Sequence, residues 1–141
     1  MAAATQDICQ VRDEIPESAP AESKVLFANT TIWRGSLSMQ VAGVTKPYVS
    51  GTAGGTLLGF AVQRYVNSTG SNVTRADDQP MVHQRGCFWL PGKAGDLPTE
   101  AEIDELVYFD DSSGTVKKTM ATNDSSGILR GIREGLYRVE I

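Results

Sequence analysis

Short runs in which apolar and polar residues alternate fill the chain from residue 25 to residue 141. Clear examples are "KVLFANTTIW", "LLGFAVQRYVN", "VHQRGCFWL", "ELVYFD" and "LYRVEI". A period of two places successive side chains on opposite faces of a β-strand. Turn residues such as "NSTG", "PGKAG" and "NDSSG" separate the runs. Many short strands at this spacing predict an all-β fold, a small β-sandwich or β-barrel.

One stretch, "LPTEAEIDEL", has a helical signal. Thr99 can cap a first turn, and Glu102 follows three residues later, as in a capping box. Pro98 and the short length limit the helix to a turn or two. The predicted fold therefore contains at most one short helix.

Residues 1–24 differ from the rest of the chain in composition. They contain five acidic residues and two prolines but no aromatic residue, and their apolar residues are isolated. Such a segment cannot bury enough apolar surface to offset its ordering entropy. The sequence thus predicts a flexible acidic N-terminal arm before a β domain of residues 25–141.

Two interpretations of the arm stay open. It is either a simple tail or a segment that orders on a neighbouring subunit as an added strand. Trp is enriched at subunit contacts, so a tryptophan of the domain joins the candidates. The candidate partner-binding residues are Ile8, Val11, Ile15, Pro16, Pro20 and Trp33.

The 141 residues carry a formal charge of −4, and the basic residues are scattered. Binding to a nucleic acid needs clustered Lys and Arg, so we do not expect a nucleic-acid partner. The longest apolar stretch, around "LLGFAV", is far shorter than the ~20 residues that span a bilayer. The start "MAAATQDICQ" lacks a secretion signal. We therefore expect a soluble intracellular protein with no membrane partner.

Cys9, Cys87 and the single histidine, His83, have neither zinc-site spacing nor the pattern of a disulfide framework. We expect reduced thiols, no metal and no cofactor. On one continuous strand His83, Arg85 and Cys87 would share a face, but a cysteine nucleophile needs a base and an orienting group beside it. A buried cysteine beside Phe88 is more typical of a core. The expected packing anchors are Trp33, Phe88, Trp89, Tyr108 and Phe109.

The adjacent Asp110 and Asp111 raise the question of an acidic site. Neighbours on a strand point to opposite faces, so the two carboxylates cannot easily converge on one ion or substrate atom. The following "SSG" supplies the polar side chains and the glycine of a hairpin. We interpret the pair as a corner between two strands.

The glycine-rich "VSGTAGGTLLGF" lacks the Lys of a phosphate loop, and Ala53 occupies a position where the dinucleotide fingerprint needs glycine. It predicts a loop that leads into a strand. Four glycosylation-like tripeptides are interpreted as turns, where Asn and Ser side chains bind nearby backbone. They begin at Asn29, Asn67, Asn72 and Asn123.

The second half of the chain resembles the small head-decoration, or cement, proteins of tailed bacteriophages. The resemblance covers roughly residues 25–141. It rests on a strand-turn-strand with paired aspartates, a glycine-led strand and a last strand ending in Val-x-Ile. The matching positions are Val107, Tyr108, Asp110, Asp111, Thr115, Val116, Gly127 and residues 139–141.

The resemblance implies a structural accessory protein that binds the outer surface of an assembled head and cements neighbouring major capsid subunits. It implies a homo-oligomer, with a trimer favoured over a dimer, that is made in the host cytoplasm and resides on the virion. No catalytic residue is assigned, so we do not expect an enzyme. The alternatives are a carbohydrate- or receptor-binding β module with exposed aromatic residues, and a small β-fold nucleotide hydrolase.

Overall fold

The computed structural model describes residues 11–12 and 20–141, and for residues 11–12 it describes the backbone alone. The fold is nearly all β, and its sheets curl into half-barrels, which confirms the predicted fold class. The strands are β1 (Val11–Arg12), β2 (Ala21–Ser23), β3 (Val25–Leu26), β4 (Thr30–Ile32), β5 (Leu37–Val41), β6 (Val44–Pro47), β7 (Gly55–Ala61), β8 (Tyr65–Asn67), β9 (Val73–Thr74), β10 (Met81–Gln84), β11 (Cys87–Pro91), β12 (Leu106–Phe109), β13 (Val116–Lys117), β14 (Ser126–Arg133) and β15 (Leu136–Glu140). A 3-10 turn, η1 (Glu100–Glu102), carries the predicted capping box on Thr99.

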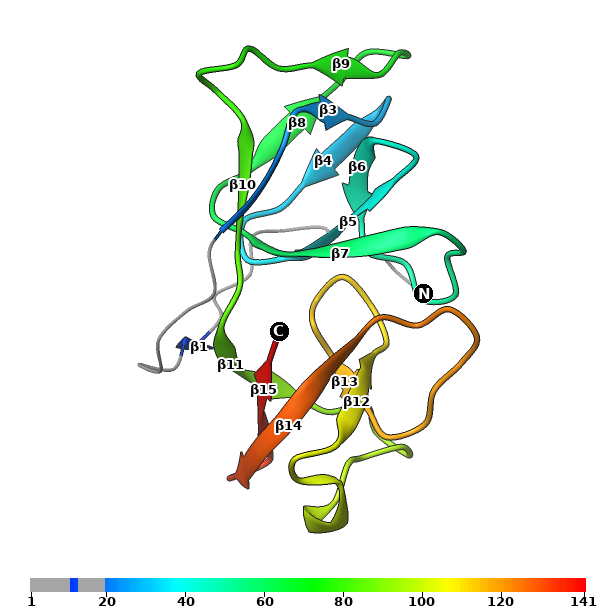
Figure 1. The fold of residues 1–141 in the computed structure, drawn as a ribbon, viewed down its shortest axis with the longest axis vertical. Coiled ribbons are helices and arrows are strands. Elements are labelled where there is room, and N and C mark those ends of the chain that lie inside the picture. Colours follow the sequence, from blue (N-terminus) through cyan, green and yellow to red (C-terminus); the bar gives the residue numbers. More distant parts are fainter. Residues whose placement is uncertain (1–10, 13–19) are drawn as a thin grey trace.

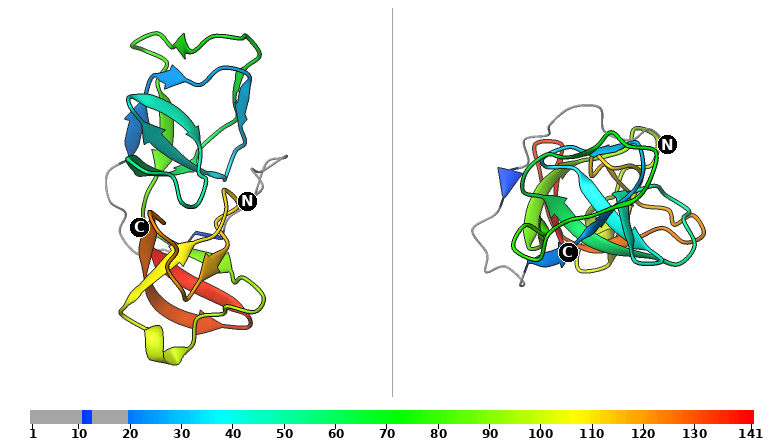
Figure 2. Two further views of the ribbon diagram at one scale, coloured as in Figure 1. Left: turned by 90° about the vertical axis from the view of Figure 1, so that its right-hand side faces the viewer. Right: turned by 90° about the horizontal axis from the view of Figure 1, so that it is seen from above.

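The strands form two large sheets and one small sheet. The upper sheet has the order β2-β10-β7-β5-β6-β3-β9, and the lower sheet has the order β1-β11-β15-β14-β12-β13. The small sheet consists of β4 and β8 and belongs to the upper half of the molecule (Figure 1). Figure 2 shows from a second direction that the two halves stack along the long axis.

The chain passes from the upper to the lower sheet between β10 and β11. The sequence predicts one continuous strand here, and that prediction is wrong, because the strand breaks at Arg85 and Gly86. The N–H and carbonyl of Gly86 pair with the carbonyl and N–H of Ile141, at 3.2 and 2.9 Å. The crossing also requires a glycine at position 59 in β7. A Cβ at this position would lie 2.3 Å from the carbonyl oxygen of Gln84, which is too close.

The two large sheets share one apolar core. Phe60 of the upper sheet and Phe88 of the lower sheet lie 4.5 Å apart between ring centroids, and Tyr48 meets Phe109 edge-on at 6.3 Å. The buried members are Leu37, Met39, Tyr48, Phe60, Phe88, Leu90, Val107, Phe109, Val116, Leu129, Tyr137 and Val139. A second cluster fills the upper half-barrel with Leu26, Ile32, Ala61, Tyr65 and Met81.

The predicted arm contains two described strands. In β1 the pairs Val11–Trp89 and Arg12–Phe88 add an antiparallel edge strand to β11. Residues 21–23 form β2, which pairs with β10 at the edge of the upper sheet. The predicted boundary at residue 24 therefore falls after the first strand of the upper sheet. Backbone pairing explains the difference, because it requires no apolar pattern in the added strand.

Candidate functional site

The pair Asp110–Asp111 forms a corner, as the sequence predicts. Asp111 Oδ1 accepts hydrogen bonds from the backbone N–H groups of Ser113 at 3.0 Å and Thr115 at 3.3 Å. The N–H of Asp110 donates to the Thr115 carbonyl at 2.8 Å, and Gly114 takes a positive φ of 84°. Asp111 thus organises the turn between β12 and β13.

Asp110 begins a line of charged groups beside this turn. Its carboxylate contacts Lys93 Nζ at 2.9 Å and Lys117 Nζ at 3.7 Å. Lys117 Nζ lies 2.8 Å from Asp124 Oδ2, and Ser50 Oγ donates to the other Asp124 oxygen. Lys117 is only 7% exposed, and the Asp124 side chain is fully buried. We call Lys93, Asp110, Lys117, Asp124 and Ser50 the charge chain.

The charge chain holds the two large sheets together. Burial by itself would raise the pKa of Asp124, but hydrogen bonds from Lys117, Ser50 and the Ala121 N–H outweigh burial and lower that pKa. Lys117 therefore serves as the cation shared by Asp110 and Asp124, which is the arrangement of a structural ion pair. Because Ser50 follows β6 and Lys117 lies in β13, the charge chain connects the upper and lower sheets.

Tyr48 forms a second connection between the sheets. Its hydroxyl donates to the Phe109 carbonyl at 2.9 Å and accepts from the Ser125 N–H at 3.1 Å. Burial raises the pKa of the Tyr48 phenol to about 12. The phenol therefore stays neutral at pH 7 and acts as a buried hydrogen-bonding bridge.

His83 and Cys87 do not form a reactive pair. His83 is fully buried in the upper half, where it lies 6.3 Å from the Tyr65 ring, whereas Cys87 pairs with Glu140 in the lower sheet. Burial lowers the pKa of His83 to about 4; the backbone of Met81 opposes this shift, although neither ring nitrogen has a partner at hydrogen-bond geometry. His83 is therefore a neutral core residue at pH 7.

Turn chemistry accounts for the asparagines and for the glycine-rich stretch. The Asn67 amide donates to the carbonyls of Leu26, Phe27 and Ser71, and its oxygen accepts from Thr69. Asn72 accepts from the Ala28 N–H; Asn29 and Asn123 take positive φ angles of 50° and 65°. Residues 50–54 form turns that lead into β7, as predicted.

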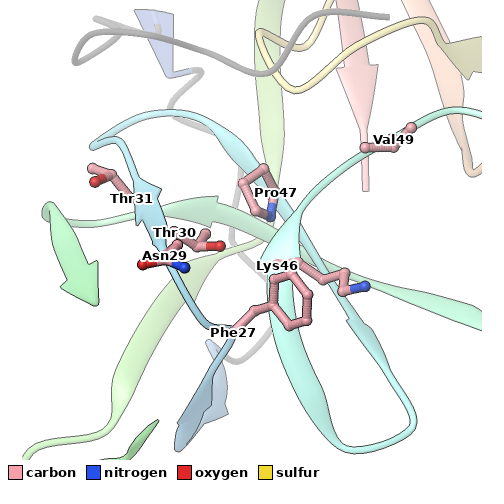
Figure 3. Close-up of a pocket in the computed structure, with 7 residues that line it drawn as sticks. All are labelled: Phe27, Asn29, Thr30, Thr31, Lys46, Pro47 and Val49. Carbon is pink, nitrogen blue, oxygen red and sulfur yellow. The ribbon is translucent and has the colours of Figure 1, made fainter. Parts of the chain in front are cut away.

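A recess on the described surface lies between β4 and β6 (Figure 3). Its volume is about 360 Å³, and it opens to solvent. Phe27 and Val49 are each 40% exposed there, and Lys46 Nζ lies 4.3 Å from the centre of the Phe27 ring. The groove is lined by Phe27, Asn29, Thr30, Thr31, Lys46, Pro47 and Val49.

The predicted partner-binding residues are spread over several places. Ile8, Ile15 and Pro16 lie outside the described residues, and Val11 is described through its backbone pairing with Trp89. Pro20 is exposed at the start of β2. Trp33 is half-buried, with the guanidinium of Arg64 4.8 Å from its ring centre. Of the expected packing anchors, Phe88 and Phe109 are buried, and Trp33, Trp89 and Tyr108 are half-buried.

The sequence contains no local signal for this groove. Phe27 follows the end of β3 and Lys46 lies in β6, so no local pattern relates them. In the described ranges, no cluster of three or more His, Cys, Asp or Glu is placed to hold a metal ion. No helix among the described residues has the length and apolar character needed to cross a membrane.

Comparison with known proteins identified no relative. No protein-family model, no curated protein and no solved structure matches the chain.

Proposed function

We propose that the chain is an accessory protein of a viral capsid, which binds the outer surface of the assembled head and holds neighbouring major capsid subunits together. In this function the protein is a homo-oligomer, with a trimer favoured over a dimer, and acts on the virion exterior after synthesis in the host cytoplasm. A binder that prefers the assembled shell stabilises it by mass action.

The observation that carries the proposal is the attachment of the N-terminal segment. Val11 and Arg12 join the sheet through backbone pairing with Trp89 and Phe88, at one edge of the lower sheet. Such an edge pairing can exchange between chains, because the same hydrogen bonds form with an equivalent strand of a neighbour. A segment that pairs in this way can link adjacent subunits.

The rest of the molecule supplies a rigid base for such a segment. The shared core, the charge chain and Tyr48 hold the two sheets together, so contacts at separate points keep a fixed geometry. Several modest contacts from one oligomer then combine into avidity when their spacing matches the lattice.

The test is co-sedimentation of purified protein with expanded and unexpanded capsids of the virus that encodes it, together with a measurement of oligomer mass. We expect preferential binding to expanded capsids. A protein lacking residues 1–19 should keep a cooperative unfolding transition and bind capsids more weakly. Full-length protein that sediments with neither capsid form would refute the proposal; equal binding by the truncated protein would refute the role of the arm.

A carbohydrate- or receptor-binding module is the second candidate, and the groove favours it because Phe27 stands exposed beside Asn29 and Thr31. The two tryptophans offer less free ring surface to a ligand, because Arg64 lies over the ring of Trp33 and the guanidinium of Arg133 lies 4.7 Å from the ring centre of Trp89. Binding on a glycan array without capsid binding would select this candidate. Turnover of nucleotides with divalent metals would instead select a nucleotide hydrolase.

A further inference from the structure

The groove beside β4 follows the edge of a strand. Thr30 and Thr31 are consecutive residues of β4, and both line the groove together with Asn29, the turn residue that precedes the strand. Neighbouring side chains of a strand point to opposite faces, so a recess lined by consecutive residues runs along the strand edge and not over one face. Figure 3 shows these three residues on one side and Lys46 and Pro47 of β6 on the other.

This edge of β4 offers unpaired backbone groups. Within the described part of the chain, β4 is paired with β8 on one side and has no hydrogen-bonded strand on the other, where β6 faces it across the groove. An edge strand exposes alternate N–H and carbonyl groups that an extended chain can bind. Three residues of a strand span about 10 Å, enough for a short peptide to add its backbone here.

The side chains around the edge define which peptide fits. Phe27, Pro47 and Val49 give the groove an apolar lining that suits one apolar side chain of a ligand. Among the described residues that line the groove, Lys46 alone is charged. Its ammonium lies over the Phe27 ring, and no described carboxylate forms an ion pair with it. A ligand carboxylate would therefore meet an ammonium without a competing ion pair.

The charge distribution along the chain points to the same ligand. From Val25 to Ala76 the sequence contains four basic residues and no Asp or Glu, although the whole chain carries −4. This segment, which forms β3 to β9, therefore has a charge of +4, and the remainder has −8. The flanking strands of the upper half add Lys24 and three acidic residues, Glu22, Asp77 and Asp78, so residues 20–84 together carry +2 and the rest of the chain −6. This balance favours an acidic partner at the upper half of the molecule. The four basic residues are Arg34, Lys46, Arg64 and Arg75.

We propose that the groove between β4 and β6 binds an extended, acidic segment of a partner protein, which adds as a strand to the edge of β4. An apolar side chain of the segment lies against Phe27, Pro47 and Val49, and a neighbouring carboxylate pairs with Lys46. The inference rests on the proposed function in one respect: in that function the major capsid protein supplies the segment.

The test begins with a displayed library of random octapeptides, selected separately on the wild-type protein, Lys46→Glu, Phe27→Ala and Lys118→Glu. Lys118 is an exposed lysine in the lower half, so its reversal matches the charge change of Lys46→Glu at a distant site. Wild type and Lys118→Glu should enrich peptides with Asp or Glu next to apolar residues. Lys46→Glu should enrich Lys or Arg at the same place, and Phe27→Ala should bind the wild-type peptides at least fivefold more weakly.

The best wild-type peptide is then titrated into isotope-labelled protein. We expect amide shifts confined to residues 27–32 and 44–49, and an affinity about fivefold higher than for the same peptide with Gln in place of the acidic residue. No enriched peptide, no change of preference in Lys46→Glu, or shifts outside the groove would overturn the proposal. Equal shifts caused by an oligothymidylate, or by raising the protein concentration alone, would overturn it in favour of a nucleic acid or of a second copy of the chain.

Capsid binding separates this inference from the proposed function. If wild type binds capsids and Lys46→Glu binds them equally well, the groove proposal fails and the capsid function stands. If the groove selects acidic peptides but the wild-type protein does not bind capsids, the peptide site stands and the capsid function fails.

Discussion

The buried carboxylate of Asp124 tests how the two sheets are held together. The substitution Asp124→Ala removes the nearer of the two carboxylates that pair with Lys117, whose side chain is only 8% exposed. Among the described residues, Lys117 then keeps the Asp110 carboxylate at 3.7 Å as its ion-pair partner. Removing one partner of a buried ion pair costs about 3–5 kcal/mol. Since Asp110 offsets part of the loss, we expect about 3 kcal/mol, or a melting temperature lower by about 6–12 °C.

The assay is urea unfolding at pH 7, in which the midpoint should fall while the slope stays constant. Asp77→Ala is the matched control, because Asp77 pairs with Lys24 in solvent; its midpoint should not change. The double variant Lys117→Met/Asp124→Ala should recover much of the loss, since it leaves no unpaired buried ammonium. The reasoning is refuted if Asp124→Ala behaves like the control, or if the double variant loses at least as much stability as Asp124→Ala alone.

The stabilisation that Asp124 contributes should decrease at low pH. Hydrogen bonds from Lys117 and Ser50 hold the pKa of Asp124 below its ordinary value in the folded protein, although burial opposes them. The stabilisation is therefore complete above the unfolded pKa of about 3.9 and is lost as the pH falls through the folded pKa. The unfolding free energies of wild type and Asp124→Ala should converge below about pH 4.

Two further substitutions test the upper half of the molecule. His83 has a pKa of about 4 in the folded protein, below its ordinary value of about 6.5 in the unfolded chain. As the pH falls, the unfolded chain therefore binds a proton before the folded protein does, and wild-type stability should fall by about 3 kcal/mol from pH 6.5 to pH 4. His83→Leu should flatten the urea-unfolding profile over that range, and an unchanged profile would contradict the assignment. Gly59→Ala places a methyl group 2.3 Å from the Gln84 carbonyl oxygen at a φ of 131°, and should cost more than about 2 kcal/mol in thermal unfolding. Gly43→Ala, which has a positive φ but open space around it, is the control and should cost less.

Local chemistry could be predicted from the sequence. The turn at Asp111 uses partners two and four residues away, and the capping box of Thr99 and Glu102 spans three residues. Each needs only the short-range order of residue types. The all-β class follows in the same way from alternation.

The pairing of strands and the burial of charge could not be predicted in this way. "LLGFAVQRYVN" reads as one strand, but β7 ends at Ala61 and Tyr65 begins β8 in another sheet, because alternation does not encode a strand's partner. Lys117 belongs to an adjacent lysine pair that suggests a solvated surface. It is buried because Asp110 and Asp124 neutralise it, and Asp124 comes from a separate loop.

The shared core has a consequence for synthesis of the chain. Leu37 and Phe60 of the upper sheet pack in the same cluster as Val139 in the last strand. At about 5–20 residues per second, the ribosome adds Val139 about 4–16 s after Phe60. During that delay the nascent upper sheet has an uncovered apolar face, so we expect folding to finish only after Val139 has left the ribosome and holdase chaperones to raise the yield.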